Sequence, residues 1–172
     1  MLEDIAIILK GFAIDKGLTV NLDSRIDPAL AVECDEKRLR QILINLGSNA
    51  IKYTLQGVVI LAASSIDTAA EEKEFVFEVI DTGVGMTEEQ ISRIFDKYEQ
   101  VHDPAAFTGG TGLGLAITKS LTEMMNGKLE IKSIPGTGSA FTLRLKMKCW
   151  PGEIIKPVLT TVKELNLDVL IA

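Results

Sequence analysis

The sequence predicts an α+β fold: a two-layer sandwich with one mixed, mostly antiparallel sheet and helices on one of its faces. The expected elements run helix, two strands, long helix, two strands, two helices separated by a loop, and two strands. Most strands therefore follow each other directly, which is typical of this class. Hydrophobic residues make up 47% of the 172 residues, enough for the core of one domain.

Two helices and two short strands are expected in the first third of the chain. Apolar residues recur at helical spacing over Met1–Lys16, and a glycine follows this segment. Two short strands come next, around an Asp-Pro turn: Leu18–Ile26 and Leu30–Cys34. Asp35 is then a suitable N-cap for a long helix that runs to about Tyr53.

The middle of the chain predicts a hairpin and a short helix. Val58–Ser64 and Glu74–Ile80 have strand patterns, and the charged stretch Asp67–Lys73 is expected to be the loop between them. A helix is expected from about Thr87 to Tyr98. Val101–Gly110 lacks periodicity and is expected to be a loop.

The last third predicts one helix, a strand pair and a tail. The helix covers Leu113–Met125, with Gly127 at its C-terminal stop. The strands Lys128–Ser133 and Ser139–Lys146 flank a Pro-Gly turn. The tripeptide Trp150-Pro151-Gly152 is expected to break the last strand, so we expect a domain over residues 1–148 and a linker over residues 149–172.

Composition excludes several classes of function. A net charge of −6 argues against a nucleic-acid interface, which needs clustered positive charge. Since the chain has one histidine, a His-rich metal site is excluded. No apolar run approaches the roughly 20 residues of a membrane span, so no membrane contact is expected. The two cysteines have no metal-ligand spacing and indicate a reduced intracellular protein. A cytoplasmic location is expected for this chain, with a membrane-anchored parent protein left open.

A polar stripe on the long helix is the first candidate site. Asn45, Asn49 and Lys52 lie four and three residues apart, so they share one side of the helix. The simplest interpretation is a solvated flank beside the core. The functional alternative is an amide oxygen for Mg²⁺ and a cation for phosphate.

Two glycine-containing segments are further candidates. Asp81-Thr82-Gly83-Val84-Gly85 follows a strand and is either a capped turn or a pocket floor, where the carboxylate accepts a hydrogen bond from an exocyclic amine such as that of adenine. The segment Gly109–Leu115 opens a helix, whose N-terminal N–H groups can bind anions. Its late position excludes a dinucleotide fold, and it lacks the lysine of a phosphate-binding P-loop. A flexible hinge remains an alternative.

Two weaker segments complete the set. Gly136–Phe141 is a hairpin turn when taken alone. In Ile94–Gln100, Phe95 and Tyr98 are expected to pack on the core, while Gln100 could reach a phosphate.

Taken in order, these segments resemble the catalytic ATP-binding domain of sensor histidine kinases, within the ATPase fold of gyrase, Hsp90, histidine kinases and MutL. The resemblance covers roughly Met1–Lys148. Asn45–Thr54 is similar to the family's N box and Asp81–Gly85 to its first glycine box. Ile94–Gln100 matches the F box, and the second and third glycine boxes follow at Gly110–Leu115 and Gly136–Phe141.

The resemblance implies roles for individual residues. Asn49 would ligate Mg²⁺, Asn45 would lie beside the phosphates of ATP, and Lys52 would pair with phosphate oxygens. Tyr53 would lie against the adenine, and Asp81 would accept a hydrogen bond from its amine. Backbone at Gly83 and Gly85 would approach the base. Residues of the second glycine box would hold the phosphates: Gly110, Thr111, Gly112, Leu113 and Gly114. Residues 101–109 would form a mobile lid over the nucleotide.

The resemblance also implies the reaction. In the ATPase branches of this fold a glutamate stands one turn before the metal-binding asparagine, whereas this chain has Asn45 there, which cannot take a proton. Transfer of the γ-phosphoryl group to a protein histidine is therefore favoured, with Asn45, Lys52 and Gln100 in the catalytic set. The alternatives are a nucleotide-binding scaffold without transfer and, less favoured, an ATP-driven clamp.

The acceptor is expected outside this chain. In the family it is a histidine on a dimerisation domain, whereas His102 here lies in the expected lid. We therefore expect a fragment that begins after the dimerisation domain. Leu167–Ala172 resembles the first strand of a response-regulator receiver domain, so a receiver domain is expected as a second partner.

Overall fold

The computed structural model describes residues 1–69, 71–95 and 113–151 of the chain. The described helices are α1 (Leu2–Ala13), α2 (Glu36–Tyr53), α3 (Glu88–Arg93) and α4 (Gly114–Met124), and a 3₁₀ turn follows α1 at Ile14–Lys16. The described strands are β1 (Thr19–Ser24), β2 (Leu30–Val32), β3 (Val58–Ala69), β4 (Glu72–Asp81), β5 (Lys128–Ile134) and β6 (Gly138–Pro151). None of these helices has the length and apolar character needed to cross a membrane.

The six described strands form one mixed sheet. Its order is β1-β3-β4-β6-β2, and β5 also pairs with β6. The pair β1–β3 is parallel, while the other pairs are antiparallel. The long strand β6 has two partners on one side, because its first half pairs with β5 and its last three residues pair with β2. The predicted mixed, mostly antiparallel sheet is confirmed.

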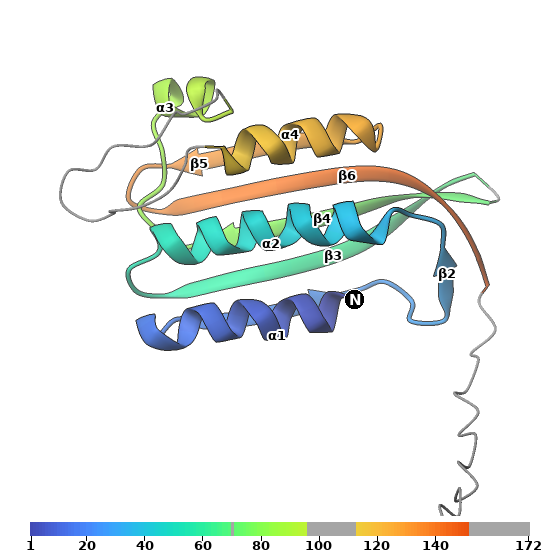
Figure 1. Ribbon diagram of the computed structural model, residues 1–172, viewed down its shortest axis with the longest axis horizontal. Helices are drawn as coiled ribbons and strands as arrows, with labels where there is room; N and C mark the ends of the chain where they lie inside the picture. The colour runs from blue at the N-terminus through green and yellow to red at the C-terminus, as the bar shows by residue number, and fades with distance from the viewer. Residues whose placement is uncertain (70, 96–112, 152–172) are drawn as a thin grey trace, which may run out of the picture.

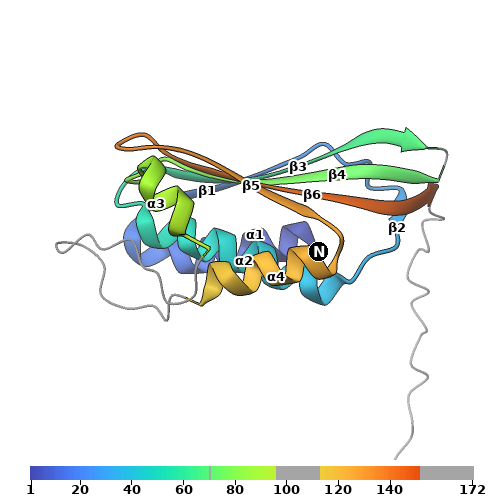
Figure 2. The same cartoon turned by 90° about the horizontal axis from the view of Figure 1, so that it is seen from above.

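The helices cover one face of this sheet. Figure 2 shows α1, α2 and α4 on the same side of the strands, and Figure 1 shows them lying side by side with α2 in the middle. The core lies between the two layers and includes the α2 side chains Leu39, Ile42, Leu43 and Leu46, each at most 1% exposed. The predicted two-layer α+β sandwich is therefore confirmed.

The first helix pair packs closely at a glycine. An ideal Cβ on Gly47 of α2 would lie 2.5 Å from Cδ1 of Leu9 on α1. Gly47 costs helix propensity, roughly 1 kcal/mol relative to alanine. In return it lets the fully buried Leu9 lie directly against the α2 backbone.

The predicted long helix is confirmed at its N-terminus. The Asp35 side chain accepts a hydrogen bond from the backbone N–H of Arg38, 3.1 Å away, and α2 ends at Tyr53 as expected. The predicted end of the first helix is also correct, since Gly17 adopts φ +64° directly after the 3₁₀ turn.

Several strand predictions were wrong in extent, and the pairing of the first two strands could not be predicted from their order. The stretch expected to be a hairpin loop continues the two strands, because Asp67 pairs with Lys73 in the ladder between β3 and β4. The Asp-Pro turn joins strands that do not pair with each other: β1 lies beside β3, and β2 beside β6. The last strand does not break at Trp150, which pairs with Ala31.

Two helix ends also differ from prediction. The helix expected to reach Tyr98 ends at Arg93, and Tyr98 itself lies outside the described residues. At the end of α4 the left-handed residue is Asn126, with φ +52°, rather than the glycine after it. Gly127 is needed for space, since a Cβ there would lie 2.4 Å from Cδ2 of Leu145.

Candidate functional site

The predicted site residues that the structure describes come from three places in the fold: the second half of α2, the segment between β4 and α3, and the start of α4. Backbone hydrogen bonds join the first two, since the Val84 N–H donates to the Tyr53 carbonyl at 3.2 Å. The Val84 carbonyl then accepts from the Gly136 N–H at 2.7 Å, which adds the turn between β5 and β6. The segments predicted to act together are therefore neighbours.

Other predicted site residues lie outside the described part of the chain. They are Gln100, Gly110, Thr111 and Gly112, together with His102 and the expected lid at residues 101–109.

Asp81, the last residue of β4, provides a buried carboxylate. It is 6% exposed, and its Oδ1 accepts a hydrogen bond from the backbone N–H of Gly83 at 2.8 Å. Burial raises the pKa of this carboxyl above that of an ordinary aspartate, while hydrogen bonds from Gly83 and Ser139 partly oppose the rise. In the described part of the chain, no lysine or arginine forms an ion pair with it.

The glycines after Asp81 are required by close packing of backbone. A Cβ on Gly83 would lie 2.4 Å from the Tyr53 carbonyl oxygen. Gly85 adopts φ +64°, and a Cβ there would lie 2.0 Å from the carbonyl oxygen of Ile134. These two positions fix the loop between the end of α2 and the β5–β6 turn, so the loop geometry around Asp81 is set by backbone contacts on both sides.

The polar stripe of α2 lies at the edge of the core, as predicted. Asn45, Asn49, Lys52 and Tyr53 are all partly exposed. The ammonium group of Lys52 lies 5.0 Å from the centroid of the Tyr53 ring, within the range of a cation–π interaction. No described residue forms a hydrogen bond with the side chain of Asn49, so its amide oxygen is available to a ligand.

Lys16 is a residue at this site that sequence reasoning missed. Its ammonium group donates to the carbonyl oxygens of Ile51 and Lys52, at 2.9 and 2.7 Å. These carbonyls belong to the last turn of α2, where a cation is favourable. Burial lowers the pKa of Lys16, and repulsion by Lys52 lowers it further. Lys16 follows a different helix, so no local pattern linked it to this one.

The start of α4 has backbone donors that no residue of the helix itself satisfies. Its N-cap residue, Leu113, makes no side-chain capping bond, and the first turn contains no acidic residue. The first intrahelical donor is the N–H of Ile117, bonded to the Leu113 carbonyl at 2.9 Å. The preceding N–H groups of the first turn have no partner within the helix, which makes this end of α4 suited to an anion.

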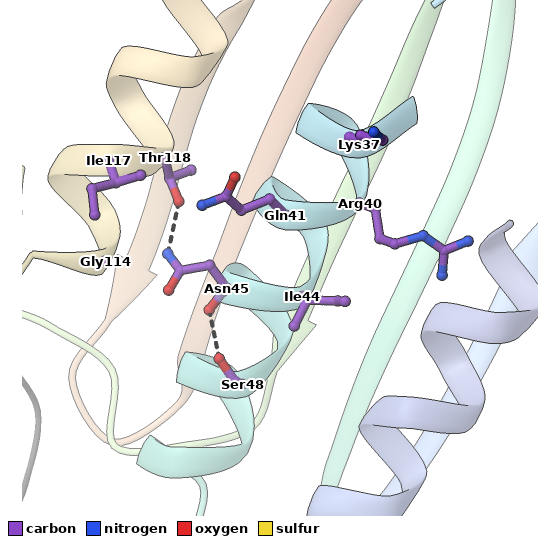
Figure 3. A pocket seen from close by; sticks show the side chains of 9 residues that line it. All are labelled: Lys37, Arg40, Gln41, Ile44, Asn45, Ser48, Gly114, Ile117 and Thr118. Carbon is purple, nitrogen blue, oxygen red and sulfur yellow. Dashed lines mark hydrogen bonds between the residues drawn. The ribbon is translucent and has the colours of Figure 1, made fainter. Parts of the chain in front are cut away.

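Asn45 joins α2 to α4. Its Nδ2 donates to Oγ1 of Thr118 at 2.7 Å, as Figure 3 shows. Both residues line a groove of about 550 Å³ between the two helices, whose rim carries the cations Lys37 and Arg40. Thr118 was missed by sequence reasoning, since a threonine on a helix gives no signal of a partner far away in the chain.

The described part of the predicted F box lies beside α4. Phe95 is partly buried rather than a core residue, and the ammonium group of Lys119 lies 5.7 Å from the centroid of its ring.

Known proteins are similar to this chain over most of its length. Residues 34–148 match the family described as histidine kinase-, DNA gyrase B-, and HSP90-like ATPases. The sensor protein GacS of Pseudomonas syringae pv. syringae is 40% identical over 149 residues, which is 86% of this chain and 16% of GacS. The circadian input-output histidine kinase CikA of Synechococcus elongatus is 43% identical over 128 residues, 73% of this chain and 16% of CikA.

Solved structures agree with these matches. Full-length ShkA in complex with AMPPNP has a TM-score of 0.72 and 32% identity, over 88% of this chain and 30% of ShkA. The catalytic domain of the histidine kinase ThkA shares the fold, with a TM-score of 0.64 and 21% identity over 84% of this chain and 90% of that domain. The predicted resemblance to sensor histidine kinases is confirmed. The chain belongs to the family of histidine kinase-, DNA gyrase B-, and HSP90-like ATPases.

Proposed function

We propose that this domain binds Mg²⁺-ATP and donates the γ-phosphoryl group to a histidine on a separate dimerisation domain. Asp81 is the observation that carries the proposal. A carboxylate that is 6% exposed and has no cationic partner among the described residues is costly to maintain. A ligand that donates a hydrogen bond to it would explain its place in the fold. The sensor kinases among the relatives, and the nucleotide complex of ShkA, support the same ligand class.

The base would bind at Asp81. Gly83 and Ser139 already donate to the carboxylate, but an ionised carboxylate offers about four acceptor positions, so it can also accept from the exocyclic amine of adenine. Gly83 and Gly85 hold the loop that forms this pocket, and Tyr53 would lie along the base.

The phosphates would bind between α2 and α4. Lys52 supplies a cation from the last turn of α2, Leu113 lies at the N-cap of α4, and Gly114 begins the first turn of that helix. Gly110, Thr111, Gly112 and Gln100 would complete this end of the site.

The residues present fit a magnesium ion bound mainly by the nucleotide. Asn49 offers one hard oxygen, and Mg²⁺ in such sites takes its remaining ligands from phosphates and water. When bound, the ion neutralises charge on the phosphates during transfer. The Asn49 side chain stands one helical turn from Asn45 and nearly one turn from Lys52, so α2 alone would hold the metal and a phosphate oxygen in register.

Transfer is favoured over hydrolysis because the site lacks a suitable base at the expected position. Asn45 takes the place of the glutamate that activates water in the ATPase branches, and its amide nitrogen is engaged by Thr118. The site would then act by positioning the γ-phosphoryl group for an incoming nucleophile. The chain spans 16% of the length of the relatives GacS and CikA. We therefore also propose its partners: a dimerisation domain of the same parent protein and a receiver domain. The proposed location is the cytoplasm.

Radiolabel transfer tests this function. The chain is mixed with the dimerisation domain of the same parent protein, Mg²⁺ and γ-labelled ATP. We expect acid-labile label on the dimerisation domain, and none when the chain carries Asn49→Ala. ATP binding without any label on the acceptor would contradict the proposal and indicate a scaffold. Steady phosphate release by the isolated chain would instead indicate a clamp-type ATPase.

A further inference from the structure

Helix α4 contributes partly buried apolar side chains to the core, and its fully buried side chains are polar. The only fully buried side chains that α4 contributes are those of Thr118 and Thr122, at 1% and 2% exposed, while its leucines are partly buried. By contrast, α2 contributes seven buried residues. A buried polar side chain must find a hydrogen-bond partner, so what these two hydroxyls bond to bears on the position of α4.

The two threonines bond to different parts of the molecule. The Thr122 hydroxyl donates to the backbone carbonyl of Thr118, 2.9 Å away, which is a bond within α4. The Thr118 hydroxyl accepts from Nδ2 of Asn45 at 2.7 Å, across a sequence separation of 73 residues. Only the second bond constrains α4 relative to α2.

The same amide contacts α4 at a second point. With its nitrogen on Thr118, the Asn45 oxygen lies over Gly114, where an ideal Cβ would come within 2.5 Å of Oδ1. Gly114 is the first residue of α4, one turn before Thr118. One planar side chain therefore spans the first turn of α4 (Figure 3).

We propose that Thr118 is a positioning residue for the phosphate end of the nucleotide site. Through Asn45 it holds the N-terminal turn of α4 at a fixed distance from the Asn49 and Lys52 side of α2. The proposal rests on the proposed function to the extent that the ligand is ATP. It concerns binding of the phosphates alone, not the transfer step.

Nucleotide affinity with and without phosphates tests this role. Thr118→Val removes the hydroxyl and keeps the side-chain shape. We expect ATP to bind about five- to tenfold more weakly, the effect of one lost hydrogen bond. Adenosine, which reaches only the Asp81 end of the site, should keep its affinity. Titration calorimetry for ATP and ligand-observed NMR for adenosine give the two dissociation constants.

Thr122→Val is the matched control, because it removes a buried hydroxyl from the same helix one turn later. It should leave the ratio of the two affinities unchanged. Thr118→Ser and Thr118→Ala form a second pair of variants. Both lack the threonine methyl group, and only the serine variant keeps the hydroxyl. We expect the serine variant to retain ATP affinity and the alanine variant to lose it, even if Thr118→Val fails to fold.

The proposal is overturned if Thr122→Val and Thr118→Val weaken ATP binding equally, if serine does not restore affinity, or if adenosine weakens in parallel with ATP. The readout is binding, so its outcome is separate from that of the transfer experiment. A chain that binds ATP but transfers no phosphoryl group contradicts the proposed reaction, whereas the ATP-to-adenosine ratio still decides the role of Thr118.

Discussion

The helices α2 and α4 border the same site, but different forces fix them in place. Seven buried residues of α2 lie against the sheet and α1, and Lys16 closes its last turn. The buried residues of α4 are two threonines, and its N-cap residue Leu113 makes no side-chain capping bond. In the proposed function the base binds at Asp81, beside the end of the firmly packed α2, whereas the phosphates bind beside the first turn of α4. If the proposed function holds, the Asn45–Thr118 bond is the contact that ties the phosphate end to the firmly packed helix.

The largest expected effect is on stability, from shortening a leucine in each helix. Leu43 of α2 is fully buried, so Leu43→Ala should lower the free energy of unfolding by about 3–5 kcal/mol. Leu121 of α4 is partly buried, and Leu121→Ala should cost about 1–2 kcal/mol. Urea unfolding followed by circular dichroism gives both values. Equal losses would show that α4 is as firmly packed as α2.

Sequence patterns predicted α2 and its surroundings better than the contacts of α4. The periodicity of α2 and its Asp35 cap are local signals, so the helix and its buried face could be located from the sequence. The Asp81–Gly85 loop carried a local signal as well. The placement of β1 beside β3, and of β2 beside β6, depends on contacts between distant segments.

Two site contacts had no local signal for the same reason. Lys16 bonds to carbonyls 35 and 36 residues away, and Asn45 bonds to a threonine 73 residues away. The residue types at these positions are ordinary for a helix surface or a helix end. Only the packing of one helix beside another makes them partners, so such contacts could not be read from the sequence.

Asp81→Asn should weaken nucleotide binding at the proposed base pocket without destabilising the fold. The Gly83 N–H requires an oxygen at the Oδ1 position, so the amide nitrogen of asparagine must take the other position. That nitrogen would face the adenine amine as donor against donor. We expect ATP affinity to fall about 100-fold, from a lost charge-assisted bond and an unpaired donor, with the free energy of unfolding raised at neutral pH because no charge is buried in the variant. Calorimetry and urea unfolding on the same preparation check both values. Retained ATP affinity would remove Asp81 from the base pocket.

Asn49→Ala should act at the other end of the site and with a smaller effect. The variant loses the one hard oxygen that α2 offers to the metal. We expect ATP affinity in Mg²⁺ to fall about tenfold, to the value measured in EDTA, consistent with the loss of a single ligand or hydrogen bond. Affinity in EDTA should not change. Ser48→Ala, on the same helix, is the control, because its hydroxyl donates to the Asn45 carbonyl within α2 at 3.1 Å. If the Mg²⁺ dependence survives in Asn49→Ala, the metal is held elsewhere.

The smallest expected effect is a pH dependence that belongs to the base pocket alone. Burial raises the pKa of Asp81, so the native state holds this proton more tightly than the unfolded state does. The ionised carboxylate therefore costs stability above its native pKa, and this cost is relieved as the pH falls through that value. Other carboxyls, such as those of Asp4 and Glu130, have lowered pKa values and act in the opposite sense. For this reason the quantity to measure is the difference in unfolding free energy between the unchanged chain and Asp81→Asn. The variant should be the more stable of the two at neutral pH, and the difference should shrink on acidification.

ATP affinity of the unchanged chain should fall over the same interval, because the protonated oxygen can no longer accept from the base. If affinity and the stability difference change over separate pH intervals, a group other than Asp81 controls binding of the base.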